Sequence, residues 1–106
     1  MQFIETHRFR REVAWTISEE ELLYVQLALV ERPRLGDLIP GGGGIRKLRW
    51  PGSGRGKRGG ARVIYYYAVR RDTILLLHVY LKGEKADLSK SEIREMRRAV
   101  REEWVE

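Results

Sequence analysis

The sequence predicts an α+β fold in which helices cover one mainly antiparallel, twisted sheet. Two helix-start signals, Ser18–Glu21 and Ser89–Glu92, each precede an apolar stripe at helical spacing. Between them, residues 45–81 hold three strand-like segments joined by short connections, which favours an antiparallel meander. A strand and a helix before Ser18 complete the expected order β-α-α-β-β-β-α, and 106 residues suit a single domain, residues 1–106.

The N-terminal third is expected to form a strand and two helices. Met1–Glu5 fits a short strand, and the arginine-rich segment His7–Trp15 is a helix candidate. The next helix begins with the capping box at Ser18 and ends before Pro33, because proline interrupts helical hydrogen bonding. Its apolar residues predict a broad buried stripe: Leu22, Leu23, Val25, Leu27, Leu29 and Val30.

The middle of the chain begins with a connector and continues with an alternating strand. Leu35–Gly44 is expected to be irregular because it ends in the stretch PGGGG, which must turn. In the strand Ile45–Trp50, side chains point alternately to the two faces, so Lys47 and Arg49 share one face. The opposite face then carries Arg46, Leu48 and Trp50.

Two further strands and a helix complete the fold. The strands are Ala61–Val69 and Thr73–Leu81, separated by the tight turn Arg70–Asp72. The second strand is apolar on both faces, which predicts a central position in the sheet. The last helix, Ser89–Trp104, has apolar residues at helical spacing: Ile93, Met96, Val100 and Trp104.

The positive charge of the chain is concentrated in its middle third. The net charge is +6, and residues 38–71 contain nine Lys and Arg without a single Asp or Glu. The segments on either side each have a slight excess of acidic residues. The sequence therefore predicts one basic surface that suits an anionic partner, such as nucleic acid, an anionic membrane or an acidic protein.

Several classes of site and location are disfavoured by composition. The absence of cysteine excludes a disulfide framework and a thiolate metal site. The two histidines, His7 and His78, lie in unrelated segments, so a zinc site is not expected and His78 is interpreted as structural. No secretory signal or membrane-spanning run is visible, which leads us to expect a cytoplasmic protein.

The loop Pro51–Gly60 resembles a phosphate-binding loop only formally. Gly54–Gly59 matches the pattern GxGxxG, but a strand follows instead of the helix that dinucleotide binding requires. The Walker A spacing also fails, because Lys57 is followed by Arg58. The ordinary alternative is a solvated hairpin tip. The absence of acids and the cations on the flanking strands favour a fixed phosphate-binding surface.

This basic surface has the side chains needed for metal-free RNA cleavage. A 2′-hydroxyl can attack the adjacent phosphorus if one group removes its proton, another stabilises the added charge and a third protonates the leaving oxygen. Lys47, Arg49 and Arg62, with Tyr80 and Lys82 nearby, are of the right chemical types. The acids are not clustered as a two-metal nuclease requires. Composition alone supports an RNA-binding module and a metal-free ribonuclease about equally.

Three stretches also carry a family resemblance. IRKLRW at 45–50, GKRGGARVIYYY at 56–67 and HVYLKGEKADLS at 78–89 resemble the RelE/ParE superfamily of toxins from bacterial type II toxin–antitoxin systems. The branch that the chain resembles most is the HigB-type (RelE-like) one, and the resemblance covers nearly the whole chain. It implies a small RelE-like fold and a ribosome-dependent endoribonuclease, or mRNA interferase, that blocks translation until an antitoxin neutralises it.

The resemblance also assigns residues to the site. The basic pair before the loop matches Lys47 and Arg49, the arginine of the next strand matches Arg62, and the cation after the last strand matches Lys82. We add Tyr80 to this predicted catalytic set. The cations predicted to contact RNA or the ribosome are Arg46, Arg55, Lys57, Arg58 and Lys85.

One position departs from the family pattern. Some members have a tyrosine or histidine near the start of the last helix, where this chain has Leu88 and Ser89. The general acid and base therefore stay open, and Tyr80, Lys57 and Lys85 are the candidates for the missing role.

The partners implied by the resemblance are the 70S ribosome, its mRNA and a cognate antitoxin. Such antitoxins often carry a helix-turn-helix domain, and a HigA-like one is expected here. No cofactor, metal ion or membrane is implied. Two alternatives are a ParE-like poison of DNA gyrase and a non-catalytic RNA-binding or regulatory domain.

Overall fold

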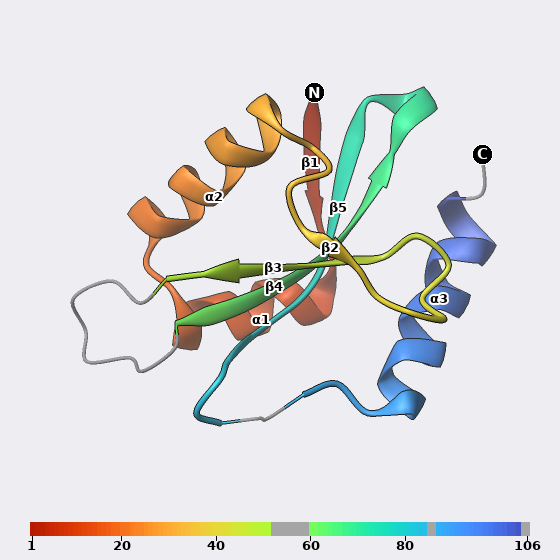
Figure 1. Cartoon of the computed structure of the whole chain (residues 1–106). Helices are drawn as coiled ribbons and strands as arrows, with labels where there is room; N and C mark the ends of the chain where they lie inside the picture. The colour runs from red at the N-terminus through yellow and green to blue at the C-terminus, as the bar shows by residue number, and fades with distance from the viewer. Residues whose placement is uncertain (52–59, 85–86, 105–106) are drawn as a thin grey trace.

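The computed structural model of the chain describes residues 1–51, 60–84 and 87–104. Within these ranges the elements follow the expected order, with one short strand and a 3₁₀ turn added (Figure 1). They are β1 (Gln2–Glu5), α1 (His7–Thr16), α2 (Glu19–Glu31), β2 (Asp37–Leu38), β3 (Arg46–Trp50), β4 (Ala61–Ala68), a 3₁₀ turn (Val69–Arg71), β5 (Thr73–Leu81) and α3 (Lys90–Trp104). None of the helices described is long and apolar enough to cross a membrane.

The strands form one mixed sheet in the order β1-β5-β4-β3-β2. The meander β3-β4-β5 is antiparallel, as expected, and β1 pairs parallel with β5. The predicted connector at Leu35–Gly44 is wrong in one respect, because Asp37 and Leu38 pair antiparallel with β3. A strand of two residues is too short to show the alternation by which strands are recognised in sequence.

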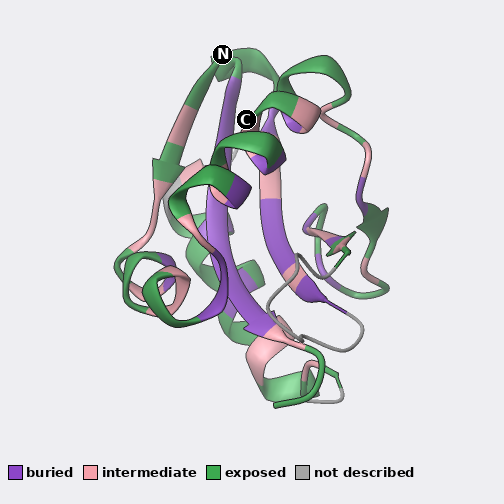
Figure 2. Ribbon diagram, turned by 90° about the vertical axis from the view of Figure 1, so that its left-hand side faces the viewer, coloured by how far each residue is buried: buried purple, intermediate pink, exposed green. Residues whose placement is uncertain are grey.

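Both faces of the sheet are buried, each by different helices. Helices α1 and α2 pack Phe9, Val25 and Leu29 on one face, while α3 packs Met96 and Val100 on the other. Figure 1 shows α3 on the right of the sheet, across from α2. Strand β5 lies between the two layers and is buried from Thr73 to Tyr80, which confirms its predicted central position (Figure 2).

Side-chain caps fix where the helices begin. Both predicted capping boxes are present: the Ser18 hydroxyl accepts from the amide of Glu21, and the Ser89 hydroxyl accepts from that of Glu92. Each glutamate in turn accepts from the serine amide. Helix α1 has a cap that the sequence analysis missed, since the Thr6 hydroxyl accepts from the Phe9 amide at 3.1 Å. These bonds satisfy amides that a helix start leaves without partners.

The predicted buried stripe of α2 is only partly correct. Val25 and Leu29 are buried, but the outward face of the helix exposes about half of each large apolar side chain: Leu23, Tyr24, Leu27 and Val30. The reason is the helical period, which sets residues 23, 27 and 30 about 80° or more away from residues 22, 25 and 29. Helix α2 therefore has apolar residues on two sides, and only one of them faces the core.

Candidate functional site

Three of the predicted site residues lie in one row across the sheet. Arg49 on β3 is directly opposite Arg62 on β4, and Arg62 is directly opposite Tyr80 on β5. Directly opposed residues project to the same face, with their Cβ atoms about 5 Å apart. Lys47 lies two residues from Arg49 and shares that face. The sheet thus brings Lys47, Arg49, Arg62 and Tyr80 together, on the side covered by α3.

A groove of about 410 Å³ opens beside Lys47 and Arg49. It lies between the β2 segment and the beginning of α3, and the side chains that line it include Asp37, Leu38, Lys47, Arg49, Asp87, Leu88, Lys90 and Ile93. Leu88, one of the two positions at which the sequence is expected to depart from the family pattern, contributes an apolar wall. Ser89, the other departing position, caps α3.

One carboxylate of this groove, Asp87, was not among the predicted site residues. Asp87 Oδ1 lies 3.5 Å from Lys47 Nζ, and the Asp87 side chain is largely exposed. The amide of Leu88 donates to Asp87 Oδ1, and this bond, with Lys47 and Arg49 nearby, holds the pKa of Asp87 below its ordinary value. Its position just before a capped helix was visible in the sequence, but its approach to a strand 40 residues earlier was not.

Tyr80 is almost fully buried, with 6% of its surface exposed. Burial raises its pKa above the ordinary 10.0, and the carboxylates Asp87 and Glu92 act in the same direction. Arg62 and Arg49 oppose the shift but do not cancel it. The phenol is therefore protonated at neutral pH and can donate a proton or a hydrogen bond.

The raised pKa of Tyr80 predicts how the protein responds to alkali. The folded state favours the protonated phenol, so this contribution to stability is complete below pH 10 and is lost as the pH rises through the higher folded pKa. In an absorbance titration, Tyr80→Phe should remove one phenol that ionises above the range of free tyrosine. Loss of amplitude in the ordinary range near pH 10 would contradict the assignment.

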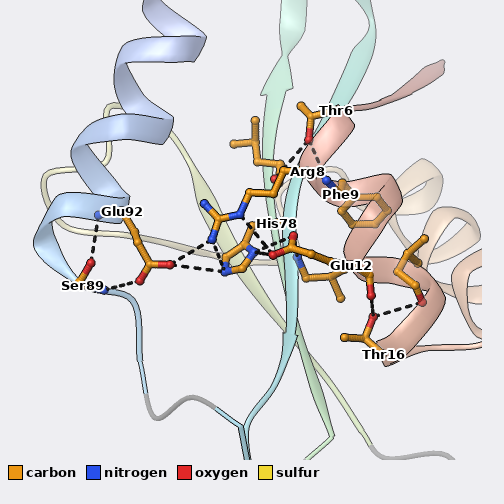
Figure 3. Close-up of polar contacts among 11 residues, drawn as sticks. Thr6, Arg8, Phe9, Glu12, Thr16, His78, Ser89 and Glu92 are labelled. Carbon is orange, nitrogen blue, oxygen red and sulfur yellow. Dashed lines mark hydrogen bonds and ion pairs between the residues drawn. The ribbon is translucent and has the colours of Figure 1, made fainter.

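His78, two residues before Tyr80, is held in a polar network that joins α1, β5 and α3 (Figure 3). Its Nδ1 donates to Glu12 at 2.8 Å, and Arg8 donates to its Nε2 at 3.3 Å. This pattern fits the neutral tautomer with the proton on Nδ1. Arg8 also pairs with Glu92 at 3.1 Å. These contacts agree with the interpretation of His78 as structural.

The other predicted site residues do not join the row. Lys82 is exposed just beyond β5, where its amide donates to the Gly60 carbonyl. Arg46 points to the opposite face, and its guanidinium donates to the carbonyls of Arg34 and Gly36. Four predicted RNA contacts, Arg55, Lys57, Arg58 and Lys85, lie outside the described residues. In the ranges that the structure describes, no group of three or more potential metal ligands occurs.

Comparisons with known proteins agree with this architecture. A crystal structure of the intact E. coli RelBE toxin–antitoxin complex contains a chain 20% identical to this one, with a TM-score of 0.58 over 74% of this chain and 92% of that one. A double arginine-to-alanine mutant of E. coli toxin RelE in the free state is 18% identical, with a TM-score of 0.65 over 89% of this chain and 94% of that one. At these identities the likeness concerns the fold.

The family itself is shown by sequence. The model of the family described as the RelE toxin of the RelE / RelB toxin–antitoxin system matches residues 1–104. The finer resemblance to the HigB-type branch stays a prediction. With nearly every residue matched, this chain belongs to the RelE toxin family and is the toxin of a toxin–antitoxin system.

Proposed function

We propose that this toxin is a cytoplasmic, ribosome-dependent endoribonuclease that cleaves mRNA without a metal ion. The observation that carries the proposal is the row Arg49–Arg62–Tyr80 with Lys47 beside it, which sets three cations and a protonated phenol on one face. Arg49 and Arg62 are direct cross-strand neighbours, a pairing of like charges that costs stability unless an anion lies between them. A phosphodiester is such an anion.

The groups of the groove and of the row that meets it at Arg49 suit the proton transfers of RNA cleavage. In the proposed reaction, the 2′-oxygen attacks the phosphorus and the bond to the 5′-oxygen breaks, leaving a 2′,3′-cyclic phosphate and a 5′-hydroxyl. Lys47, Arg49 and Arg62 bind the phosphoryl oxygens as negative charge develops on them. Asp87, ionised at neutral pH, accepts the 2′-hydroxyl proton, and Tyr80 supplies the proton to the departing oxygen.

The ribosome dependence follows from what the groove lacks. Among the described residues that line it there is no aromatic side chain on which a base could stack, so these residues give a message few contacts that would fix the scissile bond in line for attack. Correct positioning of reactants contributes several orders of magnitude to rates, and a ribosome that holds the mRNA can provide it. The basic middle segment then favours association with ribosomal RNA and predicts strong salt dependence.

The test is cleavage of a defined mRNA on programmed ribosomes, with mapping of the new 5′-hydroxyl ends. We expect cleavage with ribosomes and little without them. Asp87→Asn keeps the size of the side chain and its bond from the Leu88 amide, so it isolates the carboxylate charge. An intact message in the presence of ribosomes would refute the proposal, whereas full activity of Asp87→Asn would move the role of base to Lys47.

For the antitoxin, the outward face of α2 supplies a protein-binding surface. Four half-exposed apolar side chains lie there on a helix that contains four glutamates and no Lys or Arg. Exposed apolar patches of this kind mark protein interfaces, and the negative helix is unsuited to RNA. We propose that the cognate antitoxin, expected to be HigA-like, covers this face with an amphipathic helix whose apolar stripe is bordered by Lys or Arg.

A charge placed in the centre of this patch should weaken the toxin–antitoxin complex. Leu27→Glu would bury a carboxylate in the apolar interface and is expected to lower the affinity at least tenfold, or about 1.4 kcal/mol. Val69→Glu, at an equally exposed apolar side chain on the turn before β5, is the matched control. Calorimetric titration with the antitoxin measures both, and equal affinities for Leu27→Glu and the wild type would exclude α2 from the interface.

A further inference from the structure

A second groove lies on the other side of Tyr80, between α1 and the end of β5. Its volume is about 530 Å³, within the range of small-molecule sites. One wall is a stripe of α1 at positions 8, 11, 12 and 15, which share a helical face, and Tyr80 and Glu84 are opposite. Figure 3 shows Arg8 and Glu12 of α1 pointing toward His78 at the base of this region.

The aromatic member of this stripe is Trp15. Its side chain lines the groove, and 84% of its surface is accessible, the largest fraction among the exposed large apolar residues described. Exposure of an indole is costly, because Trp buries up to about 250 Å² when it is covered. The neighbours of Trp15 on this face of α1 are the charged residues Arg11 and Glu12 and not further large apolar side chains, in contrast to the patch on α2.

An aromatic ring beside arginine matches a single-stranded nucleic acid. Unpaired bases stack on exposed aromatic side chains, and nearby cations bind the phosphates. Arg11 lines the groove and forms no ion pair with any described residue, so its charge is available. Arg8 and Glu12 are already engaged with each other and with His78, which leaves Glu84 as the one opposing carboxylate among the lining residues described.

This second groove adjoins the row of the proposed cleavage site at Tyr80. The Tyr80 side chain belongs to the row with Arg62 and Arg49, and it also lines the second groove. An RNA strand whose phosphate lies over the row can therefore place its next nucleotide in the groove beside Tyr80. The second groove is thus an adjacent binding site for the same RNA strand, and no second reaction takes place there.

We propose that the groove between α1 and β5 binds one unpaired nucleotide next to the scissile bond, with its base stacked on Trp15 and a phosphate held by Arg11. This inference rests on the proposed ribonuclease function for its choice of ligand. It assigns to Trp15 a role in substrate binding and none in proton transfer.

The experiment is an NMR titration of ¹⁵N-labelled toxin with a short single-stranded RNA that cannot be cleaved because its 2′-hydroxyls are methylated. The chain has three tryptophans, and Trp15→Phe identifies the Trp15 indole signal. We expect that signal to shift on addition of RNA. The indole signal of Trp104, which lies on α3 with the Arg71 guanidinium over its ring, should not shift. No shift at Trp15 with RNA in excess would overturn the proposal.

Variants then separate stacking from general damage. Trp15→Ala should weaken RNA binding by about 5- to 100-fold, the effect of removing one stacked base, and Trp15→Phe should retain most of the affinity. Arg11→Ala should reduce the slope of log affinity for RNA against log salt concentration by about 1, because one phosphate contact is lost. Tyr24→Ala, at a half-exposed aromatic on α2, should bind RNA as the wild type does. Equal RNA affinity of Trp15→Ala and wild type overturns the proposal, and so does a loss confined to antitoxin binding.

The same variants distinguish this inference from the proposed function. Cleavage on ribosomes together with unchanged RNA binding by Trp15→Ala would leave the ribonuclease intact and remove the nucleotide site. Binding that depends on Trp15, without any cleavage on ribosomes, would retain the nucleotide site and refute the ribonuclease.

Discussion

Arg62→Ala is expected to lower the rate of mRNA cleavage on ribosomes by about 100- to 1,000-fold, the cost of removing one donor to a developing negative charge. Arg62 is the centre of the row, with Arg49 opposite it on one side and Tyr80 on the other. Single-turnover cleavage measures the effect on chemistry separately from product release. Arg62→Lys keeps the charge but not the planar fork, so its rate should fall between those of Arg62→Ala and the wild type.

Arg62→Ala should lose cleavage activity without a loss of folding stability. Removal of one of two directly opposed arginines relieves a repulsion, which offsets the lost packing of the Arg62 stem, so the free energy of unfolding should change by less than about 0.5 kcal/mol. Arg98→Ala is the control, at an exposed arginine of α3 that pairs with Glu102 outside the groove. If Arg62→Ala and Arg98→Ala cleaved equally well, the row would not be the catalytic surface.

Glu12→Ala is expected to reduce the free energy of unfolding by about 3 kcal/mol. The Glu12 carboxylate accepts from His78 Nδ1 at 2.8 Å and from the Val79 amide at 3.3 Å, and it pairs with Arg8 at 3.2 Å. Its truncation leaves the 2%-exposed His78 and an amide of β5 without this acceptor. Bonds to a charged acceptor contribute about 1.5–3 kcal/mol each, discounted here because Glu12 is a quarter exposed.

Urea denaturation monitored by circular dichroism measures this change. Glu95→Ala, at an exposed glutamate of α3, is the control and should lie within about 0.5 kcal/mol of the wild type. Glu12→Gln keeps the size and one acceptor oxygen, so its loss should be smaller than that of alanine. Equal stability of Glu12→Ala and Glu95→Ala would show that the network of Figure 3 contributes nothing to the fold.

Local patterns were enough to predict every helix and every strand except β2, and the face that Lys47 and Arg49 share. Alternation in residues 45–50 put Lys47 and Arg49 together, and the two capping boxes placed the beginnings of α2 and α3. Each of these signals is short-range, because side-chain direction in a strand and amide satisfaction at a helix start depend on residues close in sequence. The roles of Lys47, Arg49, Arg62, Tyr80 and Lys82 remain predictions.

Contacts between distant segments were not predictable from such patterns. The approach of Asp87 to Lys47, and the network that joins Arg8 and Glu12 to His78, connect residues 40 to 70 positions apart. The predicted burial of the outward face of α2 was wrong for another reason. The apolar character of a helical residue does not show whether the core or a partner protein covers it. The apolar pattern of α2 therefore predicted more buried residues than the structure shows.

The place of β5 in the sheet has a consequence for the cell that makes this toxin. The first strand of the chain pairs only with β5, about 70 residues later, and Tyr80 of the row is also on β5. A nascent polypeptide that grows at about 5–20 residues per second cannot form the β1–β5 pair or complete the row until β5 has been synthesised, roughly 4–15 s after β1. On the proposed function, the ribosome that translates the toxin is therefore spared until β5 has been synthesised.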